Sequence, residues 1–348
     1  MWDNMEIIIV ALIAILLAFA FTFTNGFQDA SAIAATFIAS RSASPRQGIL
    51  LVAGMNFLGA LLGGSAVAYT ISGLLTMDPG IQLVYVLLVA VFSASIWNII
   101  TWRFGLPSSS THALIGGLIG AAVAAAGIES IYWGIEELLI SPHQLAGMMK
   151  VLFFLGFSII LGLIGGYLMR KISKLVLRNS TRSVNKKIVQ INWFAAAIMA
   201  FTNGTNDSQK QLGIIALVLV AAGQTATLDV PLWARIICAI MLGAGTLGGG
   251  WRIMTTLGHR IFKIEPIHSF DSQISSGATI ALSNLAGAPI SSSHIIATSV
   301  IGVGAAENPL KVQWSVGKNI VVAMVFTIPF TMLISAGIYF IIKAFSGG

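Results

Sequence analysis

Charged side chains are scarce in this sequence. Asp, Glu, Lys and Arg together make up 9% of its 348 residues, and hydrophobic residues make up 56%. Soluble globular domains carry roughly 25% charged residues. With so few charges the chain cannot cover the surface of an ordinary cytosolic protein, and the composition excludes that class.

Cysteine is nearly absent as well. Cys238 is the only one, which excludes a disulfide framework and any metal site built from cysteines, because both need several thiols. We expect Cys238 to be a small packing residue on an apolar helix.

Acidic residues are fewer than basic ones, 12 against 19, so the formal net charge is +7. Seven of the basic residues fall within 170–187, where no acidic residue interrupts them. Short basic loops of membrane proteins stay in the cytoplasm. The positive charge therefore indicates a cytoplasmic loop, and no nucleic-acid partner is expected.

Long apolar runs are what the sequence has in quantity. A helix that spans a membrane needs about 20 mostly apolar residues. The runs that meet this length lie near 5–23, 48–75, 81–102, 148–168 and 316–342. The first opens with Asp3 and Glu6 instead of basic residues, so it is predicted to span the membrane and not to be a signal peptide. We expect an all-α, multi-pass integral membrane protein in the lipid bilayer of the cell (plasma) membrane.

Two stretches of the sequence occur twice, in the same order. The first, 23–29 (FTNGFQD), matches 201–207 (FTNGTND) at an offset of 178 residues. The second, 105–112 (GLPSSSTH), resembles 287–294 (GAPISSSH) at an offset of 182 residues. Collinear matches of this kind indicate duplicated halves. We predict a first half at 1–169, a basic cytoplasmic linker at 170–187 and a second half at 188–348.

The orientation of the two halves depends on how often each crosses the membrane. An odd number of crossings gives the halves opposite orientations, the inverted-repeat plan of many secondary transporters. Both chain ends would then lie outside, opposite the linker. Hydropathy does not decide the number, because short segments with polar tips can be re-entrant instead of spanning.

Each Ser-rich motif joins a helix breaker to a new helix start. A Gly-x-Pro sequence is followed by hydroxyl residues and then by an apolar run, 113–126 in the first copy and 295–303 in the second. Proline blocks helix continuation, while Ser and Thr cap the new helix and leave backbone N–H groups pointing outward. We therefore predict broken helices and a Ser-rich re-entrant hairpin in each half, whose tips can meet near the midplane.

Two helix N-termini surrounded by hydroxyl donors favour an oxyanion such as phosphate or sulfate. A single Ser in a membrane helix is as often a packing residue, but a duplicated cluster after a proline favours a site. The candidate anion-binding residues are Ser108, Ser109, Ser110, Thr111, Ser291, Ser292 and Ser293.

A histidine, His112 or His294, ends each cluster. Ser beside His also occurs in hydrolases, but adjacency in sequence does not bring a nucleophile and a base to hydrogen-bond distance, and the G-x-S-x-G elbow is missing. An intramembrane hydrolase is therefore a minor alternative. We expect the histidines to be accessory residues that orient the hairpins.

The duplicated Asn-Asp motifs place carboxylates in apolar surroundings, where a charge is expensive and marks an ion path. Hard cations such as Na⁺ prefer oxygen ligands, and Gly26 and Gly204 are expected to unwind the helices and expose carbonyl oxygens. The candidate Na⁺ ligands are Asn25, Gln28, Asp29, Asn203, Asn206 and Asp207. Helix capping and proton relay are alternative roles for the two aspartates. Lys210 is a candidate accessory residue that neutralises a carboxylate, assists the anion or snorkels to the interface.

These motifs resemble the inorganic phosphate transporter (PiT) family. Residues 204–210 (GTNDSQK) match its Gly-x-Asn-Asp signature, and the first copy departs from it by carrying Gln28 where the second has Asn206. The resemblance covers nearly the whole chain and implies phosphate symport coupled to Na⁺ or H⁺, with sulfate as another substrate of the family. It implies that the Ser and Thr residues hold the anion and that the Asn and Asp residues hold cations.

We therefore expect a secondary active transporter that carries inorganic phosphate with Na⁺ by alternating access, without catalysis and without an organic cofactor. A proton-coupled phosphate or sulfate symporter is one alternative. An anion channel is another, although paired carboxylates would repel anions. The Gly-rich stretches 59–64 and 243–250 permit close helix packing within one subunit or between copies in a homo-oligomer.

Overall fold

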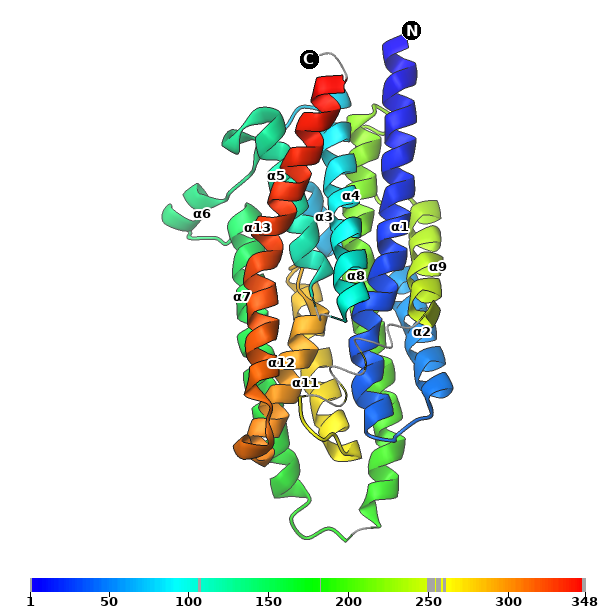
Figure 1. The fold of residues 1–348 in the computed structure, drawn as a ribbon, viewed down its shortest axis with the longest axis vertical. Helices are drawn as coiled ribbons and strands as arrows, with labels where there is room; N and C mark the ends of the chain where they lie inside the picture. Colours follow the sequence, from blue (N-terminus) through cyan, green and yellow to red (C-terminus); the bar gives the residue numbers. More distant parts are fainter. Residues whose placement is uncertain are drawn as a thin grey trace.

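The computed structural model describes residues 2–105, 108–181, 183–248, 254, 258 and 261–345. Within these ranges every element of regular secondary structure is a helix (Figure 1). In chain order the helices are α1 (Trp2–Ala39), α2 (Pro45–Leu62), α3 (Ala66–Ser72), α4 (Ile81–Phe104), α5 (Ser110–Ala126), η1 (Ile128–Ser130), α6 (Ile135–Leu139), α7 (Gly147–Val176), α8 (Val184–Ala221), α9 (Leu232–Gly248), α11 (Pro266–Leu285), α12 (Ser292–Glu307), η2 (Pro309–Lys311) and α13 (Trp314–Phe345).

The two chain ends lie at one end of the molecule, and the loop between α7 and α8 lies at the other (Figure 1). The first helix of each half, α1 or α8, has 38 residues, and the two run in opposite directions. The last helices, α7 and α13, are also antiparallel. Each half therefore crosses the molecule an odd number of times, and the inverted-repeat prediction is confirmed.

Each half contains one helical hairpin that turns back in the middle of the molecule. The α4–α5 hairpin comes from the end that carries the chain termini, and the α11–α12 hairpin comes from the linker end (Figure 1). Gly105 and Gly287 have φ values of 65° and 62° at the two reversals, a conformation that glycine adopts without steric cost. The predicted broken helices and Ser-rich hairpins are present in both halves.

In the described part of the chain, five helices are long and apolar enough to cross a membrane. They cover Met5–Ala39, Pro45–Leu62, Ile81–Phe104, Gly147–Val176 and Trp314–Phe345. Large apolar side chains on their outer faces are exposed, with Leu16 at 57% and Leu333 at 71%. Such faces suit lipid and not water, in agreement with a membrane-embedded protein.

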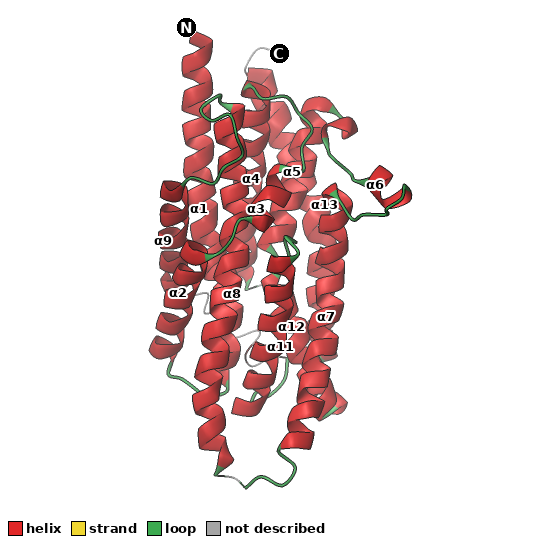
Figure 2. Ribbon diagram, turned by 180° about the vertical axis from the view of Figure 1, so that it is seen from behind, coloured by secondary structure: helices red, strands yellow, loops and turns green. Residues whose placement is uncertain are grey.

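The two halves of the sequence are interleaved in space. The last helix of the chain, α13, packs on α4 and α5 of the first half, while α7 packs on α11 and α12 of the second half (Figure 2). The first helices follow the same rule, since α1 packs on α9 and α8 packs on α2. Each hairpin is thus supported by a helix from the opposite half.

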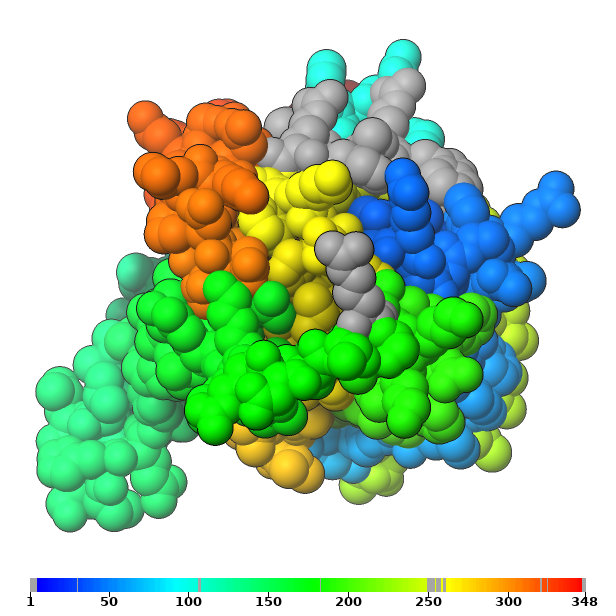
Figure 3. Space-filling model, turned by 90° about the horizontal axis from the view of Figure 1, so that it is seen from below, coloured from blue at the N-terminus to red at the C-terminus, as the bar shows by residue number. Residues whose placement is uncertain are grey.

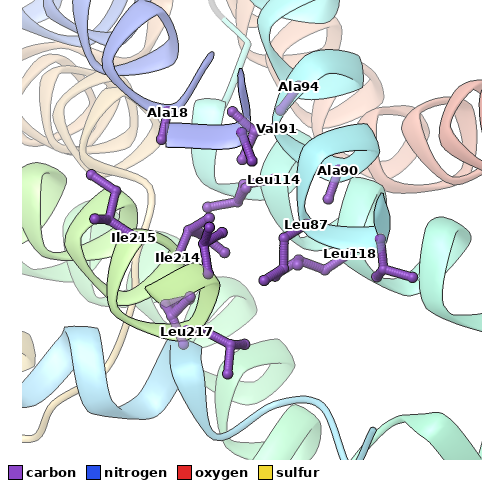
Figure 4. Packing of buried hydrophobic residues seen from close by; sticks show 14 of the residues in the cluster. Ala18, Leu87, Ala90, Val91, Ala94, Leu114, Leu118, Ile214, Ile215 and Leu217 are labelled. Carbon is purple, nitrogen blue, oxygen red and sulfur yellow. The ribbon is translucent and has the colours of Figure 1, made fainter. Parts of the chain in front are cut away.

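Two apolar clusters lie on either side of a polar layer. The first cluster includes α1 residues that precede Asn25, such as Ala18, and α8 residues that follow Lys210, such as Leu217; Figure 4 shows part of it. The second includes α1 residues that follow Asp29 and α8 residues that precede Asn203. The duplicated polar motifs therefore lie between the two hydrophobic cores. Cys238 is a fully buried member of the first cluster, as expected.

The prediction that Gly26 and Gly204 unwind their helices is wrong. Both α1 and α8 continue through these positions as α-helix. The glycines instead permit close helix crossings: a Cβ atom on Gly26 would lie 2.5 Å from the carbonyl oxygen of Leu242 in α9, and one on Gly204 would overlap the backbone of Asn56 in α2. The neighbouring helix requires that these positions carry no side chain, and the local backbone conformation does not.

A partly buried ion network joins three helices at the linker end. Arg170 of α7 donates to Glu307 of α12 at 2.7 Å and to Asp271 of α11 at 3.3 Å. Lys174 lies 3.1 Å from the same Glu307 carboxylate. In the view of Figure 3 the linker crosses this end of the molecule beside α11.

The basic stretch 170–187 covers the end of α7, the connecting loop and the start of α8. The exact limits of the two halves remain a prediction, as does a homo-oligomer.

Candidate anion and cation site

The candidate hydroxyl residues of both hairpins gather where the two tips meet. Ser109 is the N-cap of α5 and Ser291 is the N-cap of α12. All seven predicted anion-binding residues are buried, with exposed fractions of 0–1%. The tips contact each other directly: Thr111 Oγ1 donates to the carbonyl oxygen of Ile290 at 2.7 Å, and Ser293 Oγ donates to that of Ser108 at 3.1 Å.

The first hairpin tip is organised by Ser109. Its hydroxyl accepts a hydrogen bond from the backbone N–H of His112 at 3.1 Å, the usual N-cap contact. The same oxygen lies 2.7 Å from His112 Nδ1. The rings of His112 and His294 meet edge to face with their centroids 5.1 Å apart. Both histidines therefore lie at the junction of the hairpins, where they can hold its shape.

The two aspartates face the hairpin tips from α1 and α8. Ser110 Oγ donates to Asp29 Oδ2 at 2.5 Å, and Ser292 Oγ donates to Asp207 Oδ1 at 3.4 Å. Ser110 and Ser292 are equivalent in the repeat, so the contact occurs twice with the same chemistry. Each carboxylate thus lies beside one N-terminal serine of a half-helix.

The predicted cation ligands have buried side-chain oxygens that accept no hydrogen bond from the described residues. Among the described residues no hydrogen-bond partner is found for oxygen atoms of six side chains: Asn25, Gln28, Asp29, Asn203, Asn206 and Asp207. Buried polar atoms are normally paired, since leaving one unpaired costs free energy. Carboxylate and amide oxygens are the ligands of hard cations, so this donor set fits a cation such as Na⁺.

The amide nitrogens of Gln28 and Asn206 hold the hairpin reversals. Gln28 Nε2 donates to the carbonyl oxygen of Ser108 at 3.2 Å, and Asn206 Nδ2 donates to that of Ala288 at 3.3 Å. The two contacts are not equivalent in the repeat, because the offset of 182 pairs Ser108 with Ile290, two residues after Ala288. Both amides keep their oxygen atoms for another ligand.

Lys210 lies in the middle of this junction and is 1% exposed. Its Nζ donates to Asp207 Oδ1 at 2.6 Å, to Thr111 Oγ1 at 2.6 Å and to the carbonyl oxygen of Ile290 at 3.0 Å. The lysine therefore does not snorkel to the membrane interface. It joins α8 to both hairpins.

Ser108 has a different role from its neighbours. Its hydroxyl accepts a hydrogen bond from Trp97 Nε1 at 2.9 Å and lies 3.2 Å from Thr327 Oγ1 of α13. The ring of Trp97 stacks on Phe330 with an interplanar angle of 16°. The side chain of Ser108 thus attaches the first hairpin to α13, while its carbonyl oxygen faces the second hairpin.

Sequence reasoning missed several amides of the site. Asn98 of α4 donates to Thr24 at 3.3 Å, and Asn284 of α11 accepts from Asn206 at 2.6 Å. Asn56 of α2 accepts from Asn203 at 3.2 Å. The available signal was a lone amide within an apolar helix, where a polar side chain needs a partner on another helix.

Comparison with known proteins agrees with this architecture. The model described as "Phosphate transporter family" matches residues 25–194 and again 178–335. A "Probable low-affinity inorganic phosphate transporter" of Bacillus subtilis (strain 168) is 34% identical over 343 residues, which cover 97% of this chain and 98% of that protein. Its counterpart in Rhizobium meliloti (strain 1021) is 38% identical over 334 residues, which cover 96% of each chain.

A solved structure described as "The sodium-dependent phosphate transporter" has the same fold. It superimposes with a TM-score of 0.78 and 24% sequence identity, and the match covers 97% of this chain and 99% of that one.

Proposed function

Because the chain belongs to the phosphate transporter family, we propose that it carries inorganic phosphate across the membrane together with Na⁺, by alternating access. Members of this family are transporters and not enzymes, so the hydrolase alternative is wrong. The sodium-dependent transporter that shares the fold supports Na⁺ as the coupling ion.

One observation carries the proposal: the N-termini of α5 and α12 meet beside two buried carboxylates. The first backbone N–H groups of a helix and its dipole favour an anion, and phosphate has several oxygens to accept from them. The anion would bind between the two tips, at the serine and threonine residues predicted from the sequence.

Na⁺ would bind to the oxygens of the Asn-Asp motif in α1. Asp29 Oδ1, Gln28 Oε1 and Asn25 Oδ1 are buried acceptors with no donor in the described part of the chain. Together they provide one negative charge and two neutral dipoles. The equivalent motif in α8 offers oxygens of the same kind, but its carboxylate already contacts Lys210.

Cation and anion binding would be coupled through Ser110. A serine hydroxyl has one proton to donate, and Ser110 donates it to Asp29. Na⁺ bound to the Asp29 carboxylate would neutralise its negative charge and weaken it as an acceptor. The Ser110 hydroxyl could then donate its proton to a phosphate oxygen. Attraction between Na⁺ and phosphate would add to this effect, since charges interact more strongly in a pocket of low dielectric constant.

The linker would face the cytoplasm and both chain ends would face outward. The basic residues of 170–187 favour this orientation, and the linker lies opposite the termini in the fold. We propose the cell membrane as the location.

Uptake of radiolabelled phosphate into proteoliposomes tests the proposal. An inward Na⁺ gradient is compared with matched K⁺ and H⁺ gradients, with and without excess sulfate. Accumulation that requires Na⁺ and resists sulfate supports the proposal. Accumulation driven by H⁺ would reassign the coupling ion, inhibition by sulfate would widen the substrate, and flux without accumulation would indicate a channel.

A further inference from the structure

We propose that Lys210 is a built-in cation that takes the place of a second Na⁺, so that the transporter binds one Na⁺ although it has two Asn-Asp motifs. This inference rests on the proposed function for the first motif. It concerns only the charge that stands beside Asp207.

The surroundings of the Lys210 ammonium group are those of a bound cation. Its three oxygen neighbours are a carboxylate, a hydroxyl and a backbone carbonyl, at 2.6–3.0 Å. These are the ligand types that hard cations take from proteins. They also come from three separate segments, namely α8, the N-terminus of α5 and the turn before α12.

The ammonium group has no proton left for phosphate in this arrangement. Lysine carries three N–H donors, and each has an acceptor within the protein. A lysine that bound the anion directly would need to break one of these contacts. The geometry therefore favours neutralisation of Asp207 over direct contact with the substrate.

The internal repeat maps the oxygen neighbours of Lys210 onto the first half. The offset of 178 relates Asp207 to Asp29, and the offset of 182 relates Thr111 to Ser293 and Ile290 to Ser108. The hydrogen bond from Thr111 to Ile290 at 2.7 Å is repeated from Ser293 to Ser108 at 3.1 Å. The oxygen surroundings of the ammonium group are therefore duplicated.

The lysine itself is not duplicated. Residue 210 minus 178 is residue 32, which is alanine and fully buried. Gln28 Nε2 donates to the carbonyl oxygen of Ser108 at 3.2 Å, much as Lys210 donates to that of Ile290. An amide brings no charge, however. The first half therefore needs a cation from solution beside Asp29, and the second half does not need one beside Asp207.

The number of Na⁺ ions bound by the purified full chain tests this inference. We would measure ²²Na⁺ bound per chain at saturating phosphate, and phosphate binding as a function of Na⁺ concentration. The wild type is expected to bind one Na⁺ and to respond to Na⁺ as a single site. Lys210→Ala is expected to bind two and to respond more steeply.

Phosphate affinity gives a second readout. At low Na⁺ the affinity of Lys210→Ala should fall by about 5- to 150-fold, the usual range of coupling between two ligands, and high Na⁺ should restore it. Lys186→Ala, an exposed lysine at the start of the same helix, is the matched control and should behave as the wild type. A variant that still binds one Na⁺, or a wild type that binds two, would overturn the inference.

Removal of Lys210 leaves a buried carboxylate without its partner, so the variant can be unstable. Its melting temperature should then rise more steeply with added Na⁺ than that of Lys210→Ala/Asp207→Asn, because the double variant keeps only the Na⁺ site at Asp29 and has no second carboxylate to neutralise. Equal Na⁺ responses of the two variants would contradict the inference.

Ala32→Lys provides the converse test. It should place an ammonium group beside Asp29 and make phosphate binding independent of Na⁺; retained dependence in a folded Ala32→Lys variant would count against the inference. A wild type without Na⁺ dependence would defeat the proposed symport, but a gain of Na⁺ dependence in Lys210→Ala would still support the role of the lysine.

Discussion

Asp29 and Asp207 are equivalent in sequence and unequal in structure. Asp207 forms an ion pair with Lys210 in which both side chains are almost fully buried. Near Asp29 the position equivalent to Lys210 is occupied by Ala32. The Asp29 carboxylate accepts a hydrogen bond from Ser110 instead. The same chemical change at the two positions should therefore have different consequences.

Asp207→Asn is expected to destabilise the protein more than Asp29→Asn. Removing one partner of a buried ion pair costs about 3–5 kcal/mol, because the other charge is left uncompensated. Asp29→Asn removes a carboxylate and leaves no lysine behind. Melting temperatures of the two variants in detergent check this expectation, and equal losses would contradict it.

The residue contacts of the site were only partly predictable from the sequence. The duplicated motifs identified the serines, aspartates and amides that the fold brings together. The role of Lys210 was left open among three choices, because its acceptors lie 99 and 80 residues away at Thr111 and Ile290. No local pattern reports a contact over such distances along the chain.

The half-helices α5 and α12 begin with equivalent serines that cap differently. The hydroxyl of Ser109 accepts the backbone N–H of His112, whereas the hydroxyl of Ser291 makes no cap hydrogen bond. The start of α5 is therefore fixed by the side chain of its own N-cap residue, Ser109. The start of α12 depends more on its neighbours.

Ser109→Ala should cost more stability than Ser291→Ala. Loss of an N-cap hydrogen bond destabilises a protein by about 1 kcal/mol, and only Ser109 makes that bond. Thermal unfolding of both variants in the same detergent measures the difference. A larger loss for Ser291→Ala would show that the caps are assigned to the wrong helix.

Packing of α7 on α12 depends on glycine in the same way as the α1 and α8 crossings. A Cβ atom on Gly162 would overlap the hydroxyl of Thr298 and lie 2.8 Å from the carbonyl oxygen of Ile295. At Gly156 of the same helix, no described atom other than the local helix backbone lies within 4 Å of such a Cβ.

Gly162→Ala should therefore destabilise the protein by about 1–3 kcal/mol, the usual cost of overpacking. Gly156→Ala is the control and should leave stability unchanged or slightly raised, because alanine favours helix. Unfolding midpoints of the two variants check the expectation. Similar midpoints would show that α7 and α12 can move apart without cost.

The hairpins were predictable as elements, and the glycine crossings were not. Gly-x-Pro followed by hydroxyl residues has one ready explanation, a break and a new helix start. A glycine within a helix has two explanations, a local break in that helix or the close approach of a neighbouring helix. The sequence of α1 does not reveal that α9 passes beside Gly26, and so the unwinding prediction was wrong.

The whole molecule is held together by exchange of helices between its halves. The α4–α5 hairpin rests on α13, and the α11–α12 hairpin rests on α7. The internal repeat revealed that the halves are related, but not which helix supports which hairpin. That arrangement follows from packing in three dimensions and has no signature in the repeat.

Expression of the chain as two pieces, cut in the loop 177–183, tests this exchange. Each piece alone should aggregate, because its hairpin lacks the supporting helix and exposes buried surface. The two pieces expressed together should co-purify and take up phosphate. A first piece that is monodisperse in detergent on its own would show that the halves fold independently.

The antiparallel, interleaved halves also have a consequence for the history of the chain. A single ancestral half could have formed the same bundle as a dimer of two identical copies inserted in opposite directions, each lending its last helix to the other. In such a dimer every position exists twice, and a lysine beside one aspartate would stand beside both. Only after the half was duplicated into two separately encoded copies could Lys210 arise opposite Ala32, so the asymmetry of the site is younger than the duplication.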